Sequence, residues 1–155
     1  MPSAYILTAL IERAQRLVYL SSCMHQHADA NLDDILLWKR RRWNGSQAYA
    51  KTKLHDVMLA FAIARCWPDT RSNSLKLGWV PTKMGGPGAP DDLDQGPVTQ
   101  AWLAVSDDKA AKVTSRHLYH QQERSVPSEV HEAAVQDALL DYCAELTGTS
   151  IRASR

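Results

Sequence analysis

A tyrosine and a lysine lie four residues apart in the segment Tyr49-Ala-Lys-Thr-Lys53. On a helix this spacing places both side chains on one face, where they can act on one ligand. A phenol is ordinarily too weak an acid to exchange protons at neutral pH, but a neighbouring ammonium favours the phenolate and lowers the pKa. The pair therefore predicts a general acid/base, Tyr49, assisted by Lys53. The alternative without a catalytic role is a half-buried tyrosine beside a solvated lysine, a pairing that occurs in many helices.

The helix that must carry this pair has clear sequence signals at both ends. Asn44-Gly45-Ser46 supplies turn and capping chemistry before it, and Trp67-Pro68 ends it because proline cannot continue a helix. Between these signals apolar residues recur on one face, at Leu54, Val57, Met58, Phe61 and Ala62. We expect a helix from this capping segment through Arg65.

Two short segments that flank that helix are predicted as strands. Leu17-Val-Tyr-Leu20 reads as a strand buried on both faces with Ser21-Ser22 at its end, and 71–77 reads as a second strand ending at Gly78. In open α/β sheets, ligands bind beyond the carboxyl ends of the strands. The serines and the Gly78 turn should therefore lie at the same edge as the Tyr49–Lys53 pair.

The remaining pattern alternates helices with strands. We expect a helix in the first fourteen residues, a short helix over 98–105, a weak strand at 117–120 and a closing helix over 135–146 that stops at Gly148. A proline- and glycine-dense loop or lid covers 79–97. This alternation predicts an α/β fold with a parallel sheet of about three visible strands.

Three segments, in this order, resemble short-chain dehydrogenases/reductases: Leu17-Val-Tyr-Leu-Ser-Ser22, Tyr49-xxx-Lys53 and Leu77-Gly-Trp-Val-Pro-Thr82. The resemblance covers nearly the whole chain and is closest to the retinol-dehydrogenase-like or WW-domain-oxidoreductase-like branch, in which the helix similarly continues Tyr-Ala-x-x-Lys-Leu. It implies an α/β fold that is the carboxyl-terminal half of a Rossmann-like, doubly wound parallel sheet, without the amino-terminal nucleotide-binding βαβ units.

The same resemblance implies roles for individual residues. Tyr49 would donate a proton to a carbonyl or accept one from an alcohol, and Lys53 would hold the nicotinamide ribose hydroxyls. Ser22 would orient the carbonyl oxygen, whereas Ser21 would be structural. The turn that holds the nicotinamide carboxamide corresponds to Gly78, Val80 and Thr82. The cofactor would be NAD or NADP, and it carries the hydride chemistry.

Several features of the family are missing from the sequence. No glycine-rich turn lies between a first strand and helix, the Asn-Asn-Ala-Gly segment is absent, and Leu77 replaces the usual proline before Gly78. The glycines at 85, 86 and 88 are better explained as lid flexibility. We therefore expect one partial domain over 1–148, a disordered tail over 149–155 and impaired cofactor binding. The alternative is a non-catalytic fragment that binds a partner or has no function.

Charge and cysteine content indicate which binding partners and which cellular compartment to expect. Lysine and arginine total 18 against 17 acidic residues, so neither nucleic acid nor a membrane is favoured as a partner. The basic run 39–42, with Trp38 and Trp43 beside it, follows a helical turn expected over 33–38 and is read as a solvated loop face. Three cysteines without a CxxC pair indicate a reducing, cytoplasmic setting, and no targeting or transmembrane segment is predicted.

The remaining partner predictions concern metals, substrate and assembly. Histidine is a common metal ligand, and two pairs lie close in sequence, His25 with His27 and His117 with His120. No clustered cysteine or carboxylate completes a tetrahedral ligand set with either pair. We therefore expect solvated loop histidines and no metal. The partner expected is a small-molecule carbonyl or alcohol substrate. A homodimer through the helix that bears Tyr49 is compatible with the resemblance, and association would also cover the apolar faces expected where the front half is missing.

Overall fold

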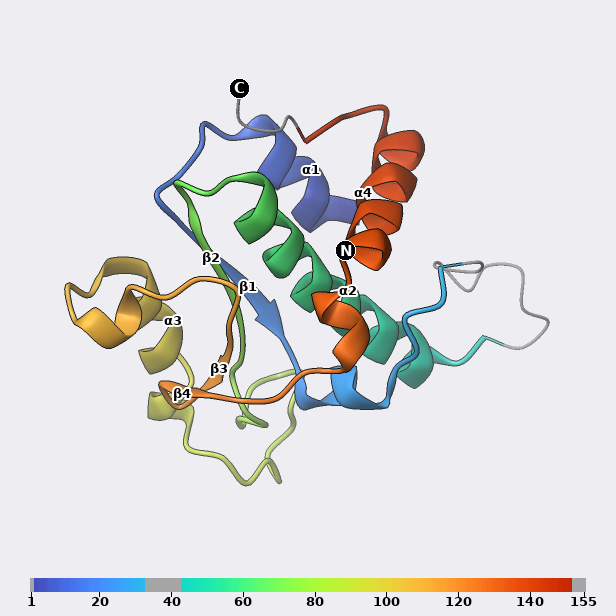
Figure 1. Cartoon of the computed structure of the whole chain (residues 1–155). Helices are drawn as coiled ribbons and strands as arrows, with labels where there is room; N and C mark the ends of the chain where they lie inside the picture. Colours follow the sequence, from blue (N-terminus) through green and yellow to red (C-terminus); the bar gives the residue numbers. More distant parts are fainter. Residues whose placement is uncertain (1, 33–42, 152–155) are drawn as a thin grey trace.

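The computed structural model describes residues 2–32 and 43–151, so the predicted helical turn over 33–38, Trp38 and the basic run 39–42 lie outside the described residues. The helices are α1 (Pro2–Leu10), α2 (Gly45–Cys66), α3 (Val98–Val105) and α4 (Ala133–Thr147). The strands are β1 (Arg16–Ser21), β2 (Arg71–Lys76), β3 (His117–Tyr119) and β4 (Gln122–Glu123). Short 3₁₀ helices connect them: η1 (Cys23–His27), η2 (Leu93–Gln95), η3 (Lys109–Ala111) and η4 (Ser128–His131). The predicted α/β class is confirmed (Figure 1).

The strands form one sheet in the order β1-β2-β3-β4. The first three strands are parallel, whereas β4 pairs antiparallel with β3 through Tyr119 and Gln122. The turn between them consists of His120 and Gln121, both with positive φ (49° and 61°). Such a turn normally uses glycine or asparagine, and because neither is present, β4 could not be predicted from the sequence.

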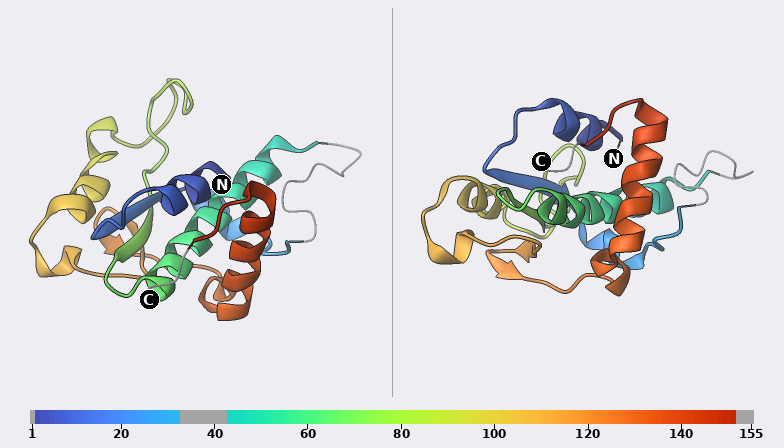
Figure 2. Two further views of the ribbon diagram at one scale, coloured as in Figure 1. Left: turned by 90° about the horizontal axis from the view of Figure 1, so that it is seen from above. Right: turned by 45° about the horizontal axis from the view of Figure 1, so that its top comes forward.

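Helices cover both faces of the sheet, as a doubly wound fold requires. The larger core joins α1, α2 and α4 to one face, and the smaller core joins Leu103 of α3 to Leu75 and Leu118 on the other (Figures 1 and 2). Leu17 and Tyr19 of β1 face the larger core while Val18 faces the smaller one, in the alternation that a strand imposes. The chain therefore contains a complete helix–sheet–helix sandwich.

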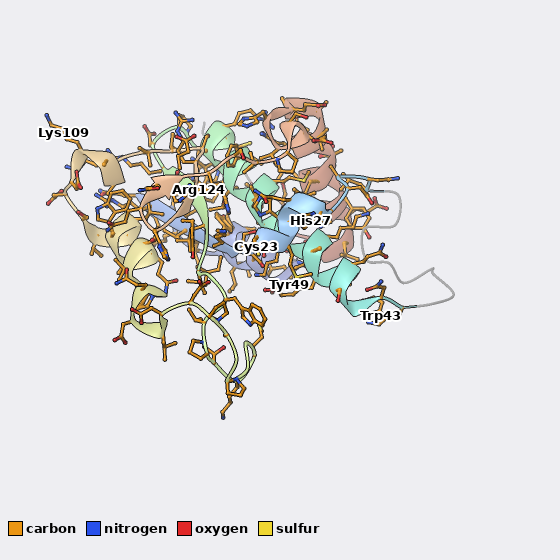
Figure 3. All side chains as sticks on the ribbon, turned by 90° about the horizontal axis from the view of Figure 1, so that it is seen from below. Cys23, His27, Trp43, Tyr49, Lys109 and Arg124 are labelled. Atoms are coloured by element: carbon orange, nitrogen blue, oxygen red, sulfur yellow. The ribbon has the colours of Figure 1, made fainter. Side chains whose placement is uncertain are left out.

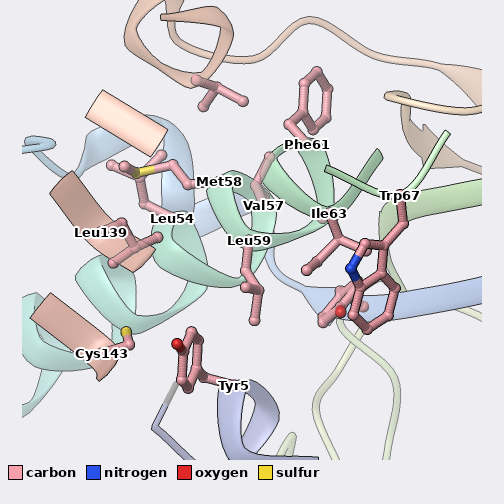
Figure 4. Close-up of a cluster of buried hydrophobic side chains, with 13 residues drawn as sticks. Tyr5, Leu54, Val57, Met58, Leu59, Phe61, Ile63, Trp67, Leu139 and Cys143 are labelled. Atoms are coloured by element: carbon pink, nitrogen blue, oxygen red, sulfur yellow. The ribbon is translucent and has the colours of Figure 1, made fainter. Parts of the chain in front are cut away.

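Helix α2 is the centre of the larger core. Seven consecutive residues of it, 57–63, are at most 5% exposed, and Figure 4 shows Tyr5 of α1 and Leu139 of α4 among the side chains that surround it. The face of β2 beneath α2 presents small residues, and the Ser72 hydroxyl donates to the Ala60 carbonyl at 2.7 Å. Small side chains and this hydrogen bond let the helix lie close to the sheet.

Strand β1 is less buried than predicted. Tyr19 and Ser21 are buried, but Leu20 is 41% exposed, so the expectation of burial on both faces is wrong at the end of the strand. The reason is its place at the edge of the sheet, paired only with β2 among the described strands. On α1, Leu7 and Leu10 are also exposed, by 63% and 70%.

The segment that follows α4 is hydrogen-bonded to Tyr5 of α1. The Tyr5 hydroxyl donates to the Thr149 carbonyl at 3.0 Å and accepts from the Ile151 N–H at 3.3 Å. Two residues of the segment predicted as a disordered tail, Thr149 and Ile151, thus contact α1, and 152–155 lie outside the described residues. In the part of the chain that the structure describes, no helix combines the length and apolar character needed to cross a bilayer.

Candidate active site at the carboxyl end of the sheet

The structure brings Tyr49 and Lys53 together near the start of α2. The Lys53 ammonium lies 5.8 Å from the centroid of the Tyr49 ring, and Tyr49 is 36% exposed. Figure 3 shows Tyr49 beside η1, on the side of the molecule where Cys23 and His27 are labelled. Both side chains are partly exposed, since that of Lys53 is 20% exposed.

Lys53 is anchored to the end of β1 by its side chain and its backbone. Its Nζ donates to the Leu20 carbonyl at 2.7 Å and to Asp56 Oδ2 at 3.2 Å. The Ser21 hydroxyl donates to the Lys53 carbonyl at 2.8 Å, which gives Ser21 the structural role expected of it. The carboxyl end of β1 therefore sets where the ammonium lies.

Ser22 directly follows β1 and caps η1. Its backbone is extended, with φ −149° and ψ 158°, and its hydroxyl accepts from the Met24 N–H at 3.4 Å. A hydroxyl has a second lone pair and a proton of its own, so this long contact leaves Ser22 able to donate to a ligand. The structure thus places Ser22 next in sequence to the strand end that anchors Lys53.

Gly78 leaves β2 through a turn that excludes any side chain. Its φ is 96°, and a Cβ there would lie 2.7 Å from Asp91 Oδ2. The same oxygen accepts from the Trp79 N–H at 2.5 Å, and the Asp91 N–H donates to the Trp79 carbonyl at 3.0 Å. Asp91 closes the turn from the far end of the loop. Nothing in the sequence predicts this role of Asp91, which is simply an aspartate after Pro90.

Val80 and Thr82 continue this turn into the loop. The Thr82 N–H donates to the Val80 carbonyl at 2.8 Å, and the exposed Thr82 hydroxyl accepts from the Gly85 N–H at 3.2 Å. A Cβ at Gly85 would lie 2.1 Å from the Val80 carbonyl oxygen. Gly85 is therefore required by a close backbone approach, which corrects its assignment to lid flexibility.

Two histidines expected to be solvated are buried together under this edge. His25 and His117 are each 1% exposed, with ring centroids 4.6 Å apart. Their Nδ1 atoms lie 2.6 Å from the Ser22 carbonyl and 2.9 Å from the Ser74 hydroxyl, and both Nε2 atoms are buried without a hydrogen-bond partner in the structure. Burial lowers the pKa of both, that of His117 to about 3. The expectation failed because η1 folds His25 inward.

Metal ligation finds no support at these histidines. Among the residues that the structure describes, no three His, Cys, Asp or Glu side chains gather closely enough to hold an ion.

A pocket in the surface lies away from this edge, near the last turn of α2, and its lining includes Arg13, Trp67 and Thr149. None of the residues of the Tyr49–Lys53 edge lines it.

Asp56 is a further polar residue of this edge that the sequence-based prediction missed. It lies one turn beyond Lys53, is 7% exposed, and burial raises the pKa of its carboxyl. Its Oδ1 is buried without a hydrogen-bond partner in the structure. The three-residue spacing from Lys53 was the available signal, since side chains at that spacing are neighbours on a helix.

Known proteins are similar in sequence to this chain over most of its length. The chain is 34% identical to a short-chain dehydrogenase, chry4, of Gibberella zeae and 30% identical to another, chyC, of Penicillium rubens, each over 96% of the chain. It is 36% identical to an uncharacterized oxidoreductase of Emericella nidulans over 95% of the chain. The chain spans only 58%, 58% and 56% of these relatives' lengths. No protein-family model matches it.

A solved structure shares the fold. The crystal structure of an uncharacterized protein from Mycobacterium paratuberculosis superposes with a TM-score of 0.76 at 21% identity, covering 97% of this chain and 57% of that one. At this identity the likeness concerns the fold alone. Together with the relatives, it agrees with the helix–sheet–helix arrangement described above. The chain belongs to the short-chain dehydrogenase/reductase superfamily and corresponds to the carboxyl-terminal half of its Rossmann-like fold.

Proposed function

We propose that this chain supplies the proton-transfer residues of an NAD(P)-dependent oxidoreductase that interconverts a small-molecule alcohol and its carbonyl compound. The observation that carries the proposal is the Lys53 ammonium, fixed to the Leu20 carbonyl at 2.7 Å and lying 5.8 Å from the Tyr49 ring centroid. The names of the fungal relatives, two dehydrogenases and an oxidoreductase, support the reaction class.

Tyr49 is the proposed acid/base. In reduction its phenol donates a proton to the carbonyl oxygen, and in oxidation its phenolate accepts the alcohol proton. The ammonium of Lys53 stabilises the phenolate electrostatically. Ser22 donates a hydrogen bond to the same substrate oxygen and orients it. Each group lies at the carboxyl end of β1 or on the adjoining turns of α2.

The residues present suit the nicotinamide end of the cofactor. Lys53 has three N–H donors, of which two contact Leu20 and Asp56 among the described residues, and we propose that the third serves the ribose hydroxyls. Gly78, Val80 and Thr82 form the turn proposed to hold the carboxamide. When bound, the nicotinamide supplies or accepts the hydride. No glycine-rich turn for a pyrophosphate exists in the sequence, so we propose that the chain alone holds NAD or NADP weakly.

A second candidate function is partner binding without catalysis. The exposed leucines of α1, Leu7 and Leu10 at 63% and 70%, favour it because exposed apolar side chains commonly mark interaction sites. Under this alternative the Tyr49 hydroxyl has no chemical task. The two functions thus differ in what removal of that hydroxyl should do.

Titration calorimetry with NADH and NADPH, followed by assays on small ketones and aldehydes, tests the enzyme function. We expect measurable binding, and Tyr49→Phe should lower turnover roughly 100- to 10,000-fold, the usual contribution of general acid–base catalysis. Tyr142→Phe, on α4, is the matched control and should leave turnover unchanged. Full activity of Tyr49→Phe would refute the assignment, and absence of both binding and turnover in the wild type would favour the second candidate.

A further inference from the structure

Asp56 is a carboxylate whose burial needs an explanation. Its side chain is only 9% exposed and its Oδ2 lies 3.2 Å from the Lys53 ammonium, while its Oδ1 has no hydrogen-bond partner in the structure. Taking a carboxylate out of water is unfavourable unless a cation or hydrogen-bond donors compensate. An ion pair with one oxygen left unsatisfied is therefore a poor device for stability alone.

Asp56 lies in a largely buried stretch of α2. Leu54 and Val57, its neighbours on α2, are fully buried at 0% exposure. Tyr19 of β1 is also buried, and its hydroxyl is 2.7 Å from the Thr8 hydroxyl. Among the described residues, the side chain of opposite charge in contact with Asp56 is that of Lys53, which is 20% exposed. A short, largely buried acidic side chain thus contacts the ammonium of a longer, more exposed basic one.

This contact completes the orientation of the Lys53 ammonium. The Leu20 carbonyl takes one N–H at 2.7 Å and Asp56 takes a second at 3.2 Å. Two fixed acceptors define the direction of the third N–H, because the three N–H bonds of an ammonium are tetrahedrally arranged about the nitrogen. Without Asp56 the ammonium could rotate about the single remaining contact.

Another lysine of α2 offers a contrast. Lys51 is 7% exposed and pairs with Asp29 at 3.3 Å, but that carboxylate is 70% exposed and faces water. Exposed partners of this kind contribute little and exchange readily with solvent. The two lysines, two residues apart on one helix, therefore differ in how firmly a carboxylate holds them.

We propose that Asp56 is a positioning residue that acts through Lys53, fixing its ammonium at the end of β1 so that one N–H is presented to the ligand hydroxyls. Asp56 itself touches neither substrate nor cofactor. The identity of that ligand as a nicotinamide ribose rests on the proposed function, whereas the positioning of Lys53 does not.

The first test observes the lysine ammonium groups by ¹⁵N NMR in the full chain. Asp56→Asn keeps the shape but removes the charge, and Asp29→Asn does the same for Lys51. We expect Asp56→Asn to shift and broaden the Lys53 resonance while that of Lys51 stays unchanged, with the reverse for Asp29→Asn. Lys53→Arg identifies the Lys53 signal. A Lys53 resonance identical in wild type and Asp56→Asn would overturn the proposal.

The second test measures NADH affinity and steady-state kinetics. Loss of a charge-assisted contact should weaken NADH binding about tenfold and raise the cofactor KM more than it lowers kcat. Asp29→Asn should match the wild type. Equal weakening by both variants would contradict the proposal, because the effect would then be general to α2.

Two other experimental outcomes also bear on the proposal. If Asp56→Asn does not fold, Asp56→Glu retains the charge but moves it by one methylene, and the Lys53 resonance must still shift. If the wild type binds no nicotinamide cofactor, the proposed function fails. The NMR comparison then still decides whether Asp56 fixes Lys53.

Discussion

At the scale of single residues, the turn after β2 shows how one backbone angle constrains a site. Gly78 has a φ of 96°, and the carboxylate of Asp91 occupies the space that a side chain would need. Gly88, in the same loop, has nothing within 4 Å of its would-be Cβ. The two glycines therefore face different constraints although they belong to one glycine-rich segment.

Gly78→Ala should destabilise the chain by about 1–2 kcal/mol, because a Cβ is disfavoured at positive φ and would displace Asp91. Gly88→Ala, the matched control, should leave stability unchanged or raise it by about 0.4–1 kcal/mol through the unfolded state. Urea unfolding of both variants measures the difference. Equal stabilities for the two would show that the Gly78 turn tolerates a side chain.

Residue pairs close in sequence could be predicted, and those brought together by folding could not. The spacing of Tyr49 and Lys53 predicted a shared helix face, and the structure places them side by side. The contact of Asp91 with the Gly78 turn joins two ends of a loop and has no periodic signal. The burial of His25 likewise depends on where η1 folds, which its polar sequence does not reveal.

At the scale of elements, α2 is the unit whose start positions the proposed site. Its amino-terminal N–H groups need acceptors, and the Asn44 side chain supplies one by accepting from the Gln47 N–H at 3.1 Å. Tyr49 lies just beyond this cap. Fraying of the first turn would therefore reach Tyr49, the proposed acid/base, directly.

Asn44→Ala should lower the free energy of unfolding by about 1 kcal/mol, the usual cost of losing an N-cap. Asn44→Ser retains an acceptor oxygen and should cost less. Thermal unfolding followed by circular dichroism distinguishes the two variants. If alanine and serine proved equal, the cap would contribute nothing to stability.

Elements with strong patterns were predicted well, and short polar ones were not. The helix predicted over 98–105 coincides with α3, and the strand predicted over 71–77 ends one residue earlier, at Lys76. The strand lies between the Trp67-Pro68 helix stop and Gly78, and α3 follows the proline- and glycine-dense loop, so sequence signals mark where each element begins or ends. The hairpin strand β4 is two exposed residues long, so its existence depends on pairing with β3.

At the scale of the whole molecule, three histidines, His25, His55 and His117, are buried and neutral. Burial lowers the pKa of each from its ordinary value of 6.5, to about 3 for His55 and His117. In the unfolded chain these groups bind protons below about pH 6.5, whereas in the folded chain they do not. The unfolded state thus gains protons as the pH falls, and stability is lost from pH 6.5 toward pH 3.

Urea unfolding between pH 7 and pH 4 should show this loss, with a slope of about 1.4 kcal/mol per pH unit for each fully titrating histidine. His117→Gln should flatten the slope by about one proton, even if its stability at pH 7 is lower. His27→Gln, at an exposed position of η1, should leave the slope unchanged. A His117→Gln slope as steep as that of the wild type would exclude His117 as a source of acid sensitivity.

The bonds that join β1 to α2 have a consequence for folding. The Ser21 hydroxyl and the Lys53 carbonyl are 32 positions apart, and the Leu20 carbonyl and the Lys53 ammonium are 33 apart. Such non-local contacts form only after the intervening chain has closed into a loop. The hydrogen bonds of Lys53 to β1 therefore form only when α2 docks on the sheet. Any motion that lifts α2 from β1 separates Ser22 from Tyr49 and Lys53, while the latter two stay together on the helix.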